Sequence, residues 1–245
     1  MVIGLTIQFK KTILGNAWLI IDPLLSILIW LMLNSSGMFN PGDTNIPYPA
    51  FLLISISLWT FFIGFFNTIG SSISEAGRML VEVSFPIEIK VTEKIILNII
   101  NFILPLTITI LVLIFMGIQF NLNNLLFLPA IIPLILFGVS MGLFFSLFEV
   151  IFFDIYILVK RSLRLIMYLT PIVYSPKLGV GLLGTITKYN PLTYLISVPR
   201  DIITGSPPNN LQEFWICSIC TGIIFMITVQ FYYISNKKII EKILD

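Results

Sequence analysis

Six apolar stretches, separated by short polar connections, account for most of this chain. They lie at residues 18–37, 50–71, 95–118, 127–149, 158–175 and 215–235. A helix needs about 20 predominantly apolar residues to cross the hydrocarbon core of a bilayer, and charged residues make up only 11% of the sequence. We therefore expect an all-α membrane protein with six transmembrane helices in a single domain over residues 1–245. A very apolar soluble helical bundle is the alternative, which this composition disfavours.

The distribution of basic residues orients the expected spans. Of the 14 Lys and Arg residues, eleven lie before the first stretch, between the second and third, around the start of the fifth, or after the sixth. Connections 34–49 and 119–126 contain none, and connection 175–214 contains only Lys177, Lys188 and Arg200. Cytoplasmic loops carry an excess of Lys and Arg. We therefore expect a multi-pass protein of the cytoplasmic membrane with both termini in the cytoplasm.

Residues 2–16 form a short amphipathic pattern ahead of the first stretch. Ile3, Ile7 and Leu14 share one face of a helix, and Lys11 lies mostly elsewhere. Such a helix can lie in the headgroup plane with its lysines toward anionic lipid. We expect an N-terminal interfacial helix, the alternative being a polar lead-in to the first span.

The cytoplasmic connection at residues 72–94 mixes seven charged residues with large apolar ones such as Met79 and Phe85. Pro86 must interrupt any helix there, so two short helices joined at residues 84–86 are expected. Solvated loops seldom expose so many apolar side chains, which indicates a docking surface for a partner protein. The alternative is a helix packed against the membrane base of this chain itself.

Residues 168–210 do not read as a simple loop. Thr170-Pro171 and Ser175-Pro176 break the fifth stretch near its outer end, and two short apolar pieces, 178–186 and 192–199, flank Asn190-Pro191. Both pieces are too short to cross a bilayer, so we expect a re-entrant extracytoplasmic helical hairpin that closes a pathway. An ordinary loop resting on the surface is the alternative.

Charged residues also gather at 153–164, where Asp154 precedes Lys160, Arg161 and Arg164. Charges this close to a span are costly unless they are paired or hydrated, so they are expected to face a protein interior or the cytoplasmic interface. A cluster of snorkelling side chains that follows the positive-inside rule is equally consistent with the sequence.

The residues needed for catalysis are missing. The chain has no histidine, the commonest general base, and no G-x-x-x-x-G-K-[ST] phosphate loop. Asp22, Glu149 and Asp154 lie near span ends rather than at the midplane, where ion-driven carriers need carboxylates. Cys217 and Cys220 lack polar partners for a metal or redox site. We expect no enzyme activity, no bound cofactor or metal and no nucleic-acid partner, and energy supplied by a partner ATPase.

Five pieces of the sequence, in order, resemble the permease subunits of ABC-2 type exporters of polysaccharides and teichoic acids. They are residues 9–18 with a later Pro23, residues 80–88 around Phe85-Pro86, Phe152-Phe153-Asp154, residues 168–174, and Asn190-Pro191 followed by Arg200-Asp201. Together they run through the whole chain. One departure is Phe153, where the family usually has Arg, so Lys160, Arg161 or Arg164 would have to supply that charge.

The resemblance implies a homodimer paired with two copies of a separate ATPase, which binds ATP and Mg²⁺. The cargo would be a lipid-linked glycan of the O-antigen, capsule or teichoic-acid type, moved between the leaflets of the membrane. The residues that would couple the chain to the ATPase are Glu75, Arg78, Glu82, Phe85, Pro86 and Glu88. The residues that would form the gate are Pro171, Tyr174, Asn190, Pro191, Arg200 and Asp201.

A path for a glycan favours aromatic rings together with hydroxyls and amides, because sugars present both C–H faces and hydroxyl groups. The second stretch carries this mixture at Trp59, Thr60, Phe62, Phe66 and Asn67, which are the candidate lining residues. They could equally face lipid. Two other classes remain open: a stand-alone ion-driven lipid or glycan flippase, and a membrane transferase acting on lipid-linked sugars.

Overall fold

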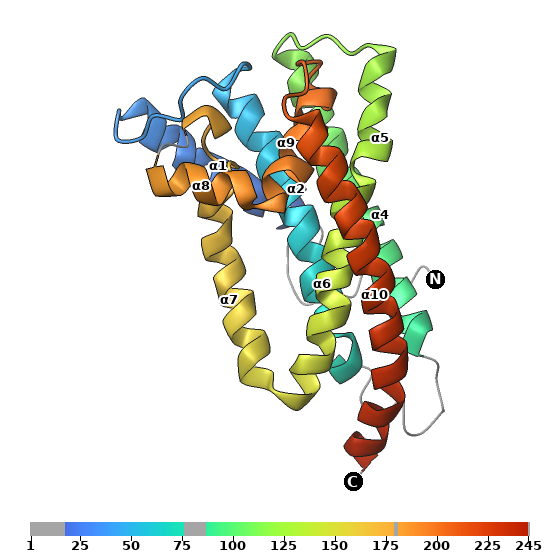
Figure 1. Ribbon diagram of the computed structural model, residues 1–245. Coiled ribbons are helices and arrows are strands. Elements are labelled where there is room, and N and C mark those ends of the chain that lie inside the picture. The colour runs from blue at the N-terminus through green and yellow to red at the C-terminus, as the bar shows by residue number, and fades with distance from the viewer. Residues whose placement is uncertain (1–17, 76–86, 179–180, 245) are drawn as a thin grey trace.

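The computed structural model describes residues 18–75, 87–178 and 181–244 of the chain, and every regular element in these ranges is a helix (Figure 1). In chain order the elements are α1 (Trp18–Ser35), α2 (Tyr48–Gly70), α4 (Ile87–Phe115), η3 (Leu122–Leu126), α5 (Phe127–Ala130), α6 (Ile132–Ile151), α7 (Phe153–Leu169), η4 (Pro176–Leu178), α8 (Gly181–Tyr189), α9 (Pro191–Ile203) and α10 (Leu211–Leu244). The all-α prediction is confirmed for this part of the chain.

Four of the six predicted spans are long and apolar enough to cross a membrane: Tyr48–Gly70, Ile87–Phe115, Leu122–Ile151 and Leu211–Ser235. The described part of α1 contributes only a shorter apolar helix, Leu24–Ser35. Helix α7 has 17 residues, which at 1.5 Å per residue gives about 25 Å, less than the roughly 30 Å of a hydrocarbon core. The count of six spans is therefore not confirmed.

Helix α2 occupies the centre of the bundle and packs against α6, α4, α1 and α9 (Figure 1). In its most apolar window 78% of the residues are buried, against 6% for α4 and 17% for α10. A helix that is hydrophobic all round is either buried or faces lipid. The position of α2 makes it the buried case, whereas α4 and α10 keep apolar surface exposed on the outside of the bundle.

Small residues on α6 allow α2 to approach closely. A Cβ atom on Gly142 would lie 2.9 Å from the carbonyl oxygen of Phe65, and one on Gly138 would lie 3.3 Å from that of Phe62. In lipid no hydrophobic effect drives helices together, so close van der Waals packing must hold them, and small residues at the crossing allow that close approach. The phenyl ring of Phe62 then stacks on that of Phe137, with centroids 5.7 Å apart.

The chain breaks where proline predicted it. Helix α7 ends at Leu169, directly before Thr170-Pro171, and α8 and α9 meet at Asn190. The predicted hairpin is thus present as two short helices, while its depth in a bilayer stays a prediction. One expectation is corrected: residues 87–94 are not a separate short helix but the first turns of α4. The predicted helix at residues 2–16 and the break at residues 84–86 lie outside the described residues.

Candidate functional site

Two ends of the bundle carry the polar residues that the sequence singled out. We call one the hairpin end, where α8, α9 and the loop at residues 36–47 lie together, and the other the base, where α6 turns into α7 at Phe152 (Figure 1). The six candidate gate residues all belong to the hairpin end. Among the candidate coupling residues, Glu75 and Glu88 are described, and Arg78, Glu82, Phe85 and Pro86 lie outside the described residues.

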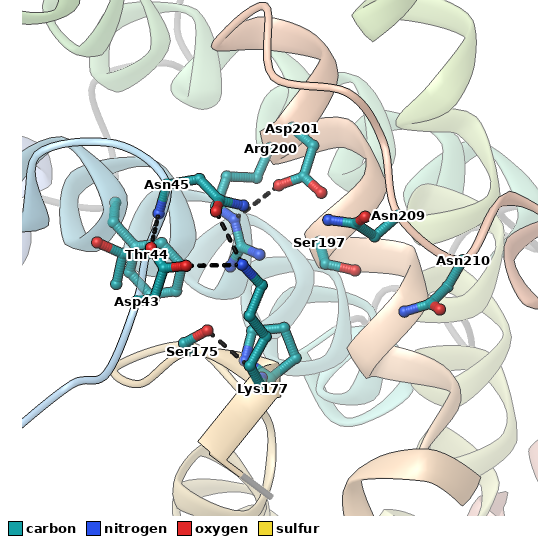
Figure 2. A pocket seen from close by; sticks show the side chains of 12 residues that line it. Asp43, Thr44, Asn45, Ser175, Lys177, Ser197, Arg200, Asp201, Asn209 and Asn210 are labelled. Carbon is teal, nitrogen blue, oxygen red and sulfur yellow. Dashed lines mark hydrogen bonds and ion pairs between the residues drawn. The ribbon is translucent and has the colours of Figure 1, made fainter.

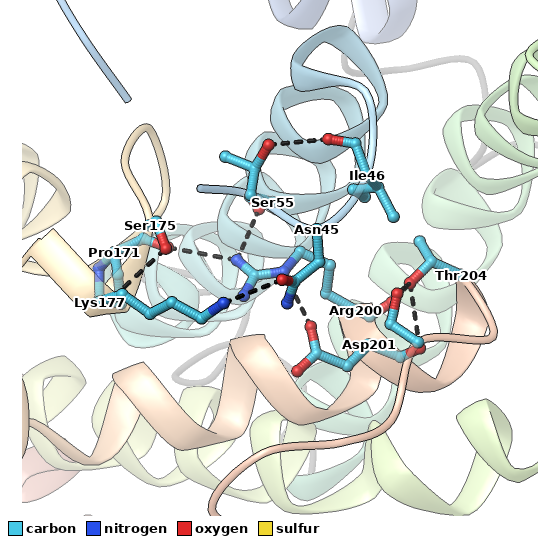
Figure 3. A network of polar contacts seen from close by, with 11 residues as sticks. Asn45, Ile46, Ser55, Pro171, Ser175, Lys177, Arg200, Asp201 and Thr204 are labelled. Carbon is cyan, nitrogen blue, oxygen red and sulfur yellow. Dashed lines mark hydrogen bonds and ion pairs between the residues drawn. The ribbon is translucent and has the colours of Figure 1, made fainter. Parts of the chain in front are cut away.

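A buried arginine joins three elements at the hairpin end. Arg200 on α9 is 3% exposed, and its Nη1 donates to the hydroxyl of Ser55 on α2 at 3.2 Å and to the carbonyl of Pro171 at 3.3 Å (Figure 3). Its Nε lies 3.4 Å from Oδ1 of Asp201, and the guanidinium lies 4.2 Å from the ring centroid of Phe51. Since a buried charge is tolerated only when it is paired and hydrogen-bonded, these contacts hold α9 in place against α2.

Asn190 forms the turn between the two short helices. Its Oδ1 accepts a hydrogen bond from the backbone N–H of Leu192 at 3.0 Å and so caps α9, with Pro191 as the first residue of the helix. Asparagine is a preferred N-cap, and proline suits the first helical position because no N–H is needed there. Its Nδ2 donates to the hydroxyl of Thr170 at 2.8 Å. One side chain therefore shapes the hairpin and ties it to the end of α7.

The loop at residues 36–47 is held against the segment that follows α7. Lys177 donates to Oδ2 of Asp43 at 2.8 Å and to Oδ1 of Asn45 at 3.0 Å (Figure 2). The hydrogen bond from Lys177 lowers the pKa of the Asp43 carboxyl below its ordinary value, with help from the backbone N–H of Asn45. Both members of the ion pair are exposed, so the pair positions the loop more than it stabilises the fold.

Two buried contacts reinforce the same junction. The hydroxyl of Tyr48 donates to the carbonyl of Val173 at 3.0 Å, and the backbone N–H of Ser175 donates to the carbonyl of Pro41 at 2.8 Å. Tyr174, between them, is 6% exposed. The segment at residues 170–175 is thus anchored to the middle of the loop at Pro41 and to the first residue of α2.

These elements surround a polar pocket of about 270 Å³. Figure 2 shows its lining residues: Asp43, Thr44, Asn45, Phe51, Ser175, Pro176, Lys177, Ser197, Arg200, Asp201, Asn209 and Asn210. Carboxylate, amide, hydroxyl and ammonium groups therefore meet in one place. Such a set offers both donors and acceptors, which is the chemistry that a polyhydroxylated molecule requires.

Sequence reasoning found part of this site. All six candidate gate residues lie at the hairpin end, but only Arg200 and Asp201 line the pocket, and their role as a gate stays a prediction. The missed residues are Asp43, Asn45, Ser55 and Lys177. The sequence did offer a hint of the pair between Asp43 and Lys177. Asp43 is the single charged residue in the connection at residues 34–49, and Lys177 is the first basic residue in the connection at residues 175–214, which is predicted to lie on the same side of the membrane.

At the base, the two described coupling candidates have different surroundings. Glu75 accepts hydrogen bonds from Lys94 on α4 and from the hydroxyl of Ser71. Burial alone would raise the pKa of Glu75, but these hydrogen bonds and the charge of Lys94 outweigh it, and the net shift is downward. Glu88 lies exposed at the start of α4. Glu75 therefore joins the segment that follows α2 to α4, and Glu88 is exposed to solvent.

The five candidate path residues do not form one surface within this chain. The rings of Phe62 and Phe66 are fully buried, and Phe66 stacks on Tyr156 with centroids 5.6 Å apart. Thr60 is exposed. Trp59 and Asn67, in contrast, line a small pocket between α2 and α7. Their helical spacing could not distinguish the packed face of α2 from the open one, because α2 is apolar on all sides.

A bundle with four helices long and apolar enough to cross a membrane among its described residues defines a multi-pass membrane protein. The sequence profile of the ABC-2 type transporter family matches residues 4–204. This match covers most of the chain, so the protein belongs to the ABC-2 type transporter family.

Curated relatives agree with this family assignment. The chain is 26% identical over 236 residues to the O-antigen export system permease protein RfbA of Klebsiella pneumoniae, covering 95% of this chain and 88% of the relative. It is 25% identical over 168 residues to the protein of the same name from Myxococcus xanthus, covering 68% of this chain and 63% of that relative. The chain is thus a membrane transport component similar to named polysaccharide permeases.

Proposed function

We propose that this protein is the membrane permease of an ATP-driven exporter that moves a lipid-linked polysaccharide of the O-antigen type across the cytoplasmic membrane. It works as a homodimer with two copies of a separate ATPase, which binds ATP and Mg²⁺. The observation that carries this proposal is an alignment over 95% of the chain, at 26% identity, with a relative named as an O-antigen export permease. The chain also belongs to the ABC-2 family.

The charge distribution supports the orientation that export requires. Eleven of the 14 basic residues lie in the segments that the sequence assigns to the cytoplasm, and of these Lys90 and Lys94 lie at the start of α4 and Lys160 and Arg161 on α7, the helix that begins at the base. The base therefore faces the cytoplasm and the hairpin end faces outward. The ATPase then docks at residues 72–94, and Glu88 stands exposed on that side. The hairpin of α8 and α9 enters the outer leaflet, where its backbone is covered by α2, α7 and the loop at residues 36–47.

The contacts of the hairpin end support its role as a gate. Arg200, Asn190 and Lys177 each join elements that are far apart in the sequence. Their simultaneous bonds hold the hairpin end closed, and an outward movement of α9 would break the bonds of Arg200 to Ser55 and to the carbonyl of Pro171 together. The polar pocket beside them receives sugar units as they leave the path, because its amides and carboxylates match sugar hydroxyls.

The test of this function is complementation. A strain that lacks the gene should lose its surface polysaccharide and regain it when this permease is expressed with its partner ATPase. An ATPase with its phosphate-loop lysine changed to alanine should fail to restore export, although it is produced and co-purifies with the permease. Surface polysaccharide restored by the permease with no active ATPase would contradict the proposal and favour an ion-driven flippase.

Docking is tested separately. Reversing the charge of Glu82 and Glu88 together should abolish co-purification with the ATPase while the permease still elutes as a folded dimer. As a matched control, reversing Glu213 at the start of α10, on the opposite side, should leave co-purification unchanged. Unchanged co-purification of the Glu82 and Glu88 variant would remove the docking role from residues 72–94.

A further inference from the structure

A second, smaller pocket lies between α2 and α7 and has a different character from the pocket at the hairpin end. Its volume is about 90 Å³, and it is lined by Trp59, Ile63, Asn67, Lys160, Leu163 and Arg164. The α2 residues are spaced four apart, and so are Lys160 and Arg164 on α7, so each set lies on one helical face. Two cations therefore face an amide and an indole across a narrow gap.

Lys160 and Arg164 form no salt bridge with any carboxylate of the described residues. None of the four salt bridges between described residues includes Lys160 or Arg164. Glu149 is near enough to attract Lys160 electrostatically, but it forms no salt bridge with it, and the nearest aromatic contact of Lys160 is the ring of Tyr156 at 6.0 Å. No described carboxylate pairs with Arg164, so the pocket holds uncompensated positive charge.

The depth of these side chains makes that charge significant. Counted from Phe153, where α7 begins, Lys160 lies about 10 Å and Arg164 about 16 Å along the helix at 1.5 Å per residue. With the base in the cytoplasm, as the proposed function has it, the pocket extends from the cytoplasmic half of the bilayer to about its middle. Cations at such depth are rare and are usually functional. Lys160 and Arg164 are exposed on the surface of the chain and also line the pocket, so a ligand from the surrounding lipid can reach them.

The remaining polar group points to a ligand that can also donate a hydrogen bond. Oδ1 of Asn67 is buried and has no hydrogen-bond partner among the described residues, and a buried acceptor without a partner is expensive. Lysine and arginine only donate, whereas the Asn67 oxygen only accepts. A simple halide would satisfy the cations alone. A phosphate ester satisfies both, because its ionised oxygens accept and a protonated oxygen, or a neighbouring hydroxyl, donates.

The size of the pocket selects the part of the ligand that enters. A pocket of about 90 Å³ has room for a phosphate group, and its two cations suit that group better than an uncharged sugar ring. Arginine binds phosphate through two parallel N–H groups, and lysine binds it as a point charge. The rest of the ligand must then lie outside the pocket, in the lipid or in the path.

We propose that the pocket between α2 and α7 binds the phosphate of a lipid from the cytoplasmic leaflet, through Lys160 and Arg164 with Asn67 as acceptor. This inference rests on the proposed function for its orientation and for its ligand in the cell. Two lipids share this chemistry: the phosphorylated polyprenyl anchor of an exported glycan, and a membrane phospholipid. Binding of the anchor would place the start of the cargo beside α7 before the gate opens.

The experiment measures lipid binding to the full chain, purified in detergent with the subunits it retains, by native mass spectrometry. The probes are undecaprenyl diphosphate, phosphatidylglycerol and undecaprenol, which lacks phosphate. The double variant Lys160→Gln/Arg164→Gln should bind undecaprenyl diphosphate at least about tenfold more weakly, as expected when charge-assisted hydrogen bonds are lost. Arg161→Gln, on the same helix and outside the pocket, is the matched control and should bind like the wild type.

Each outcome decides the matter. An equal loss in Arg161→Gln, or equal binding of undecaprenol, would overturn the proposal. If phosphatidylglycerol binds as tightly as undecaprenyl diphosphate and is lost in the same double variant, the phosphate site stands and its occupant is the phospholipid. Asn67→Asp provides a nearly isosteric second variant that adds repulsion, and it should also weaken phosphate binding. Binding is measured without transport, so a failed export assay would refute the proposed function and leave this result intact.

Discussion

Arg200 offers the sharpest test of how the hairpin end is held. The substitution Arg200→Ala removes hydrogen bonds to Ser55 and to the carbonyl of Pro171 and the ring contact with Phe51. It also leaves Asp201, whose side chain is 13% exposed, without its cation. Removing one partner of a buried pair costs about 3–5 kcal/mol, so the free energy of unfolding should fall by that amount.

The conservative variant separates charge from geometry. Arg200→Lys keeps the positive charge beside Asp201. A lysine ammonium lacks the planar donor group of arginine, so it cannot donate to the Ser55 hydroxyl and the Pro171 carbonyl in the same way. Its loss should be smaller, about 1–3 kcal/mol for the hydrogen bonds to a charged group that disappear. Lys177→Gln, which removes an exposed cation of the same end, should change the free energy of unfolding little.

The assay is unfolding of the purified protein in mixed micelles by titration with dodecyl sulphate, followed by tryptophan fluorescence. The double variant Arg200→Ala/Asp201→Asn should be more stable than Arg200→Ala alone, because it no longer buries an unpaired carboxylate. If Arg200→Ala unfolds within about 0.5 kcal/mol of the wild type, a range typical of surface substitutions, the junction of α9 with α2 does not depend on this side chain and the reasoning is wrong.

Three further outcomes follow from other contacts. Asn190→Ala, which loses the cap of α9 and the bond to Thr170, should cost about 1–2 kcal/mol and speed hydrogen exchange in α9, whereas Asn190→Asp should keep the cap and most of the protection. The distribution of distances between spin labels on Asn40 and Pro176 should broaden as the pH falls below 3.8, the ordinary pKa of Asp43. The pKa of Asp43 is lower in the folded protein, so the stabilisation by Lys177 is lost only when Asp43 becomes protonated below that pH. In Asp43→Asn the distribution should be broad at every pH. Gly142→Ala should lower the free energy of unfolding by about 1–3 kcal/mol through overpacking against Phe65, whereas Gly222→Ala, with open space around it, should not.

The breaks that form the hairpin could be predicted in part from local chemistry. Thr170-Pro171 favours the end of a helix and Asn190-Pro191 favours the start of one, since proline lacks an N–H and asparagine caps. The partners of Arg200 could not be anticipated in this way. Ser55 lies 145 residues earlier in the chain, and no local pattern connects a serine in one apolar stretch to an arginine in another.

The candidate path residues likewise could not be sorted from local sequence alone. Trp59, Phe62, Phe66 and Asn67 look equivalent in the sequence because all lie on one apolar helix. Packing against α6 buries Phe62 and Phe66, while the gap beside α7 leaves Trp59 and Asn67 at a pocket. Which of these residues is buried depends on its neighbouring helix: α6 carries glycines that allow close packing, whereas α7 carries charged residues.

The sequence by itself determined the helical class, four of the spans, the break after Leu169 and the turn at Asn190. Each of these follows from hydrophobic length or from the backbone chemistry of a few adjacent residues. Only the tertiary structure decided that α2 lies at the centre, that Arg200 joins three elements, and that Lys160 and Arg164 face Asn67. Those facts depend on contacts between distant segments, whose free energies are realised only when the helices pack together.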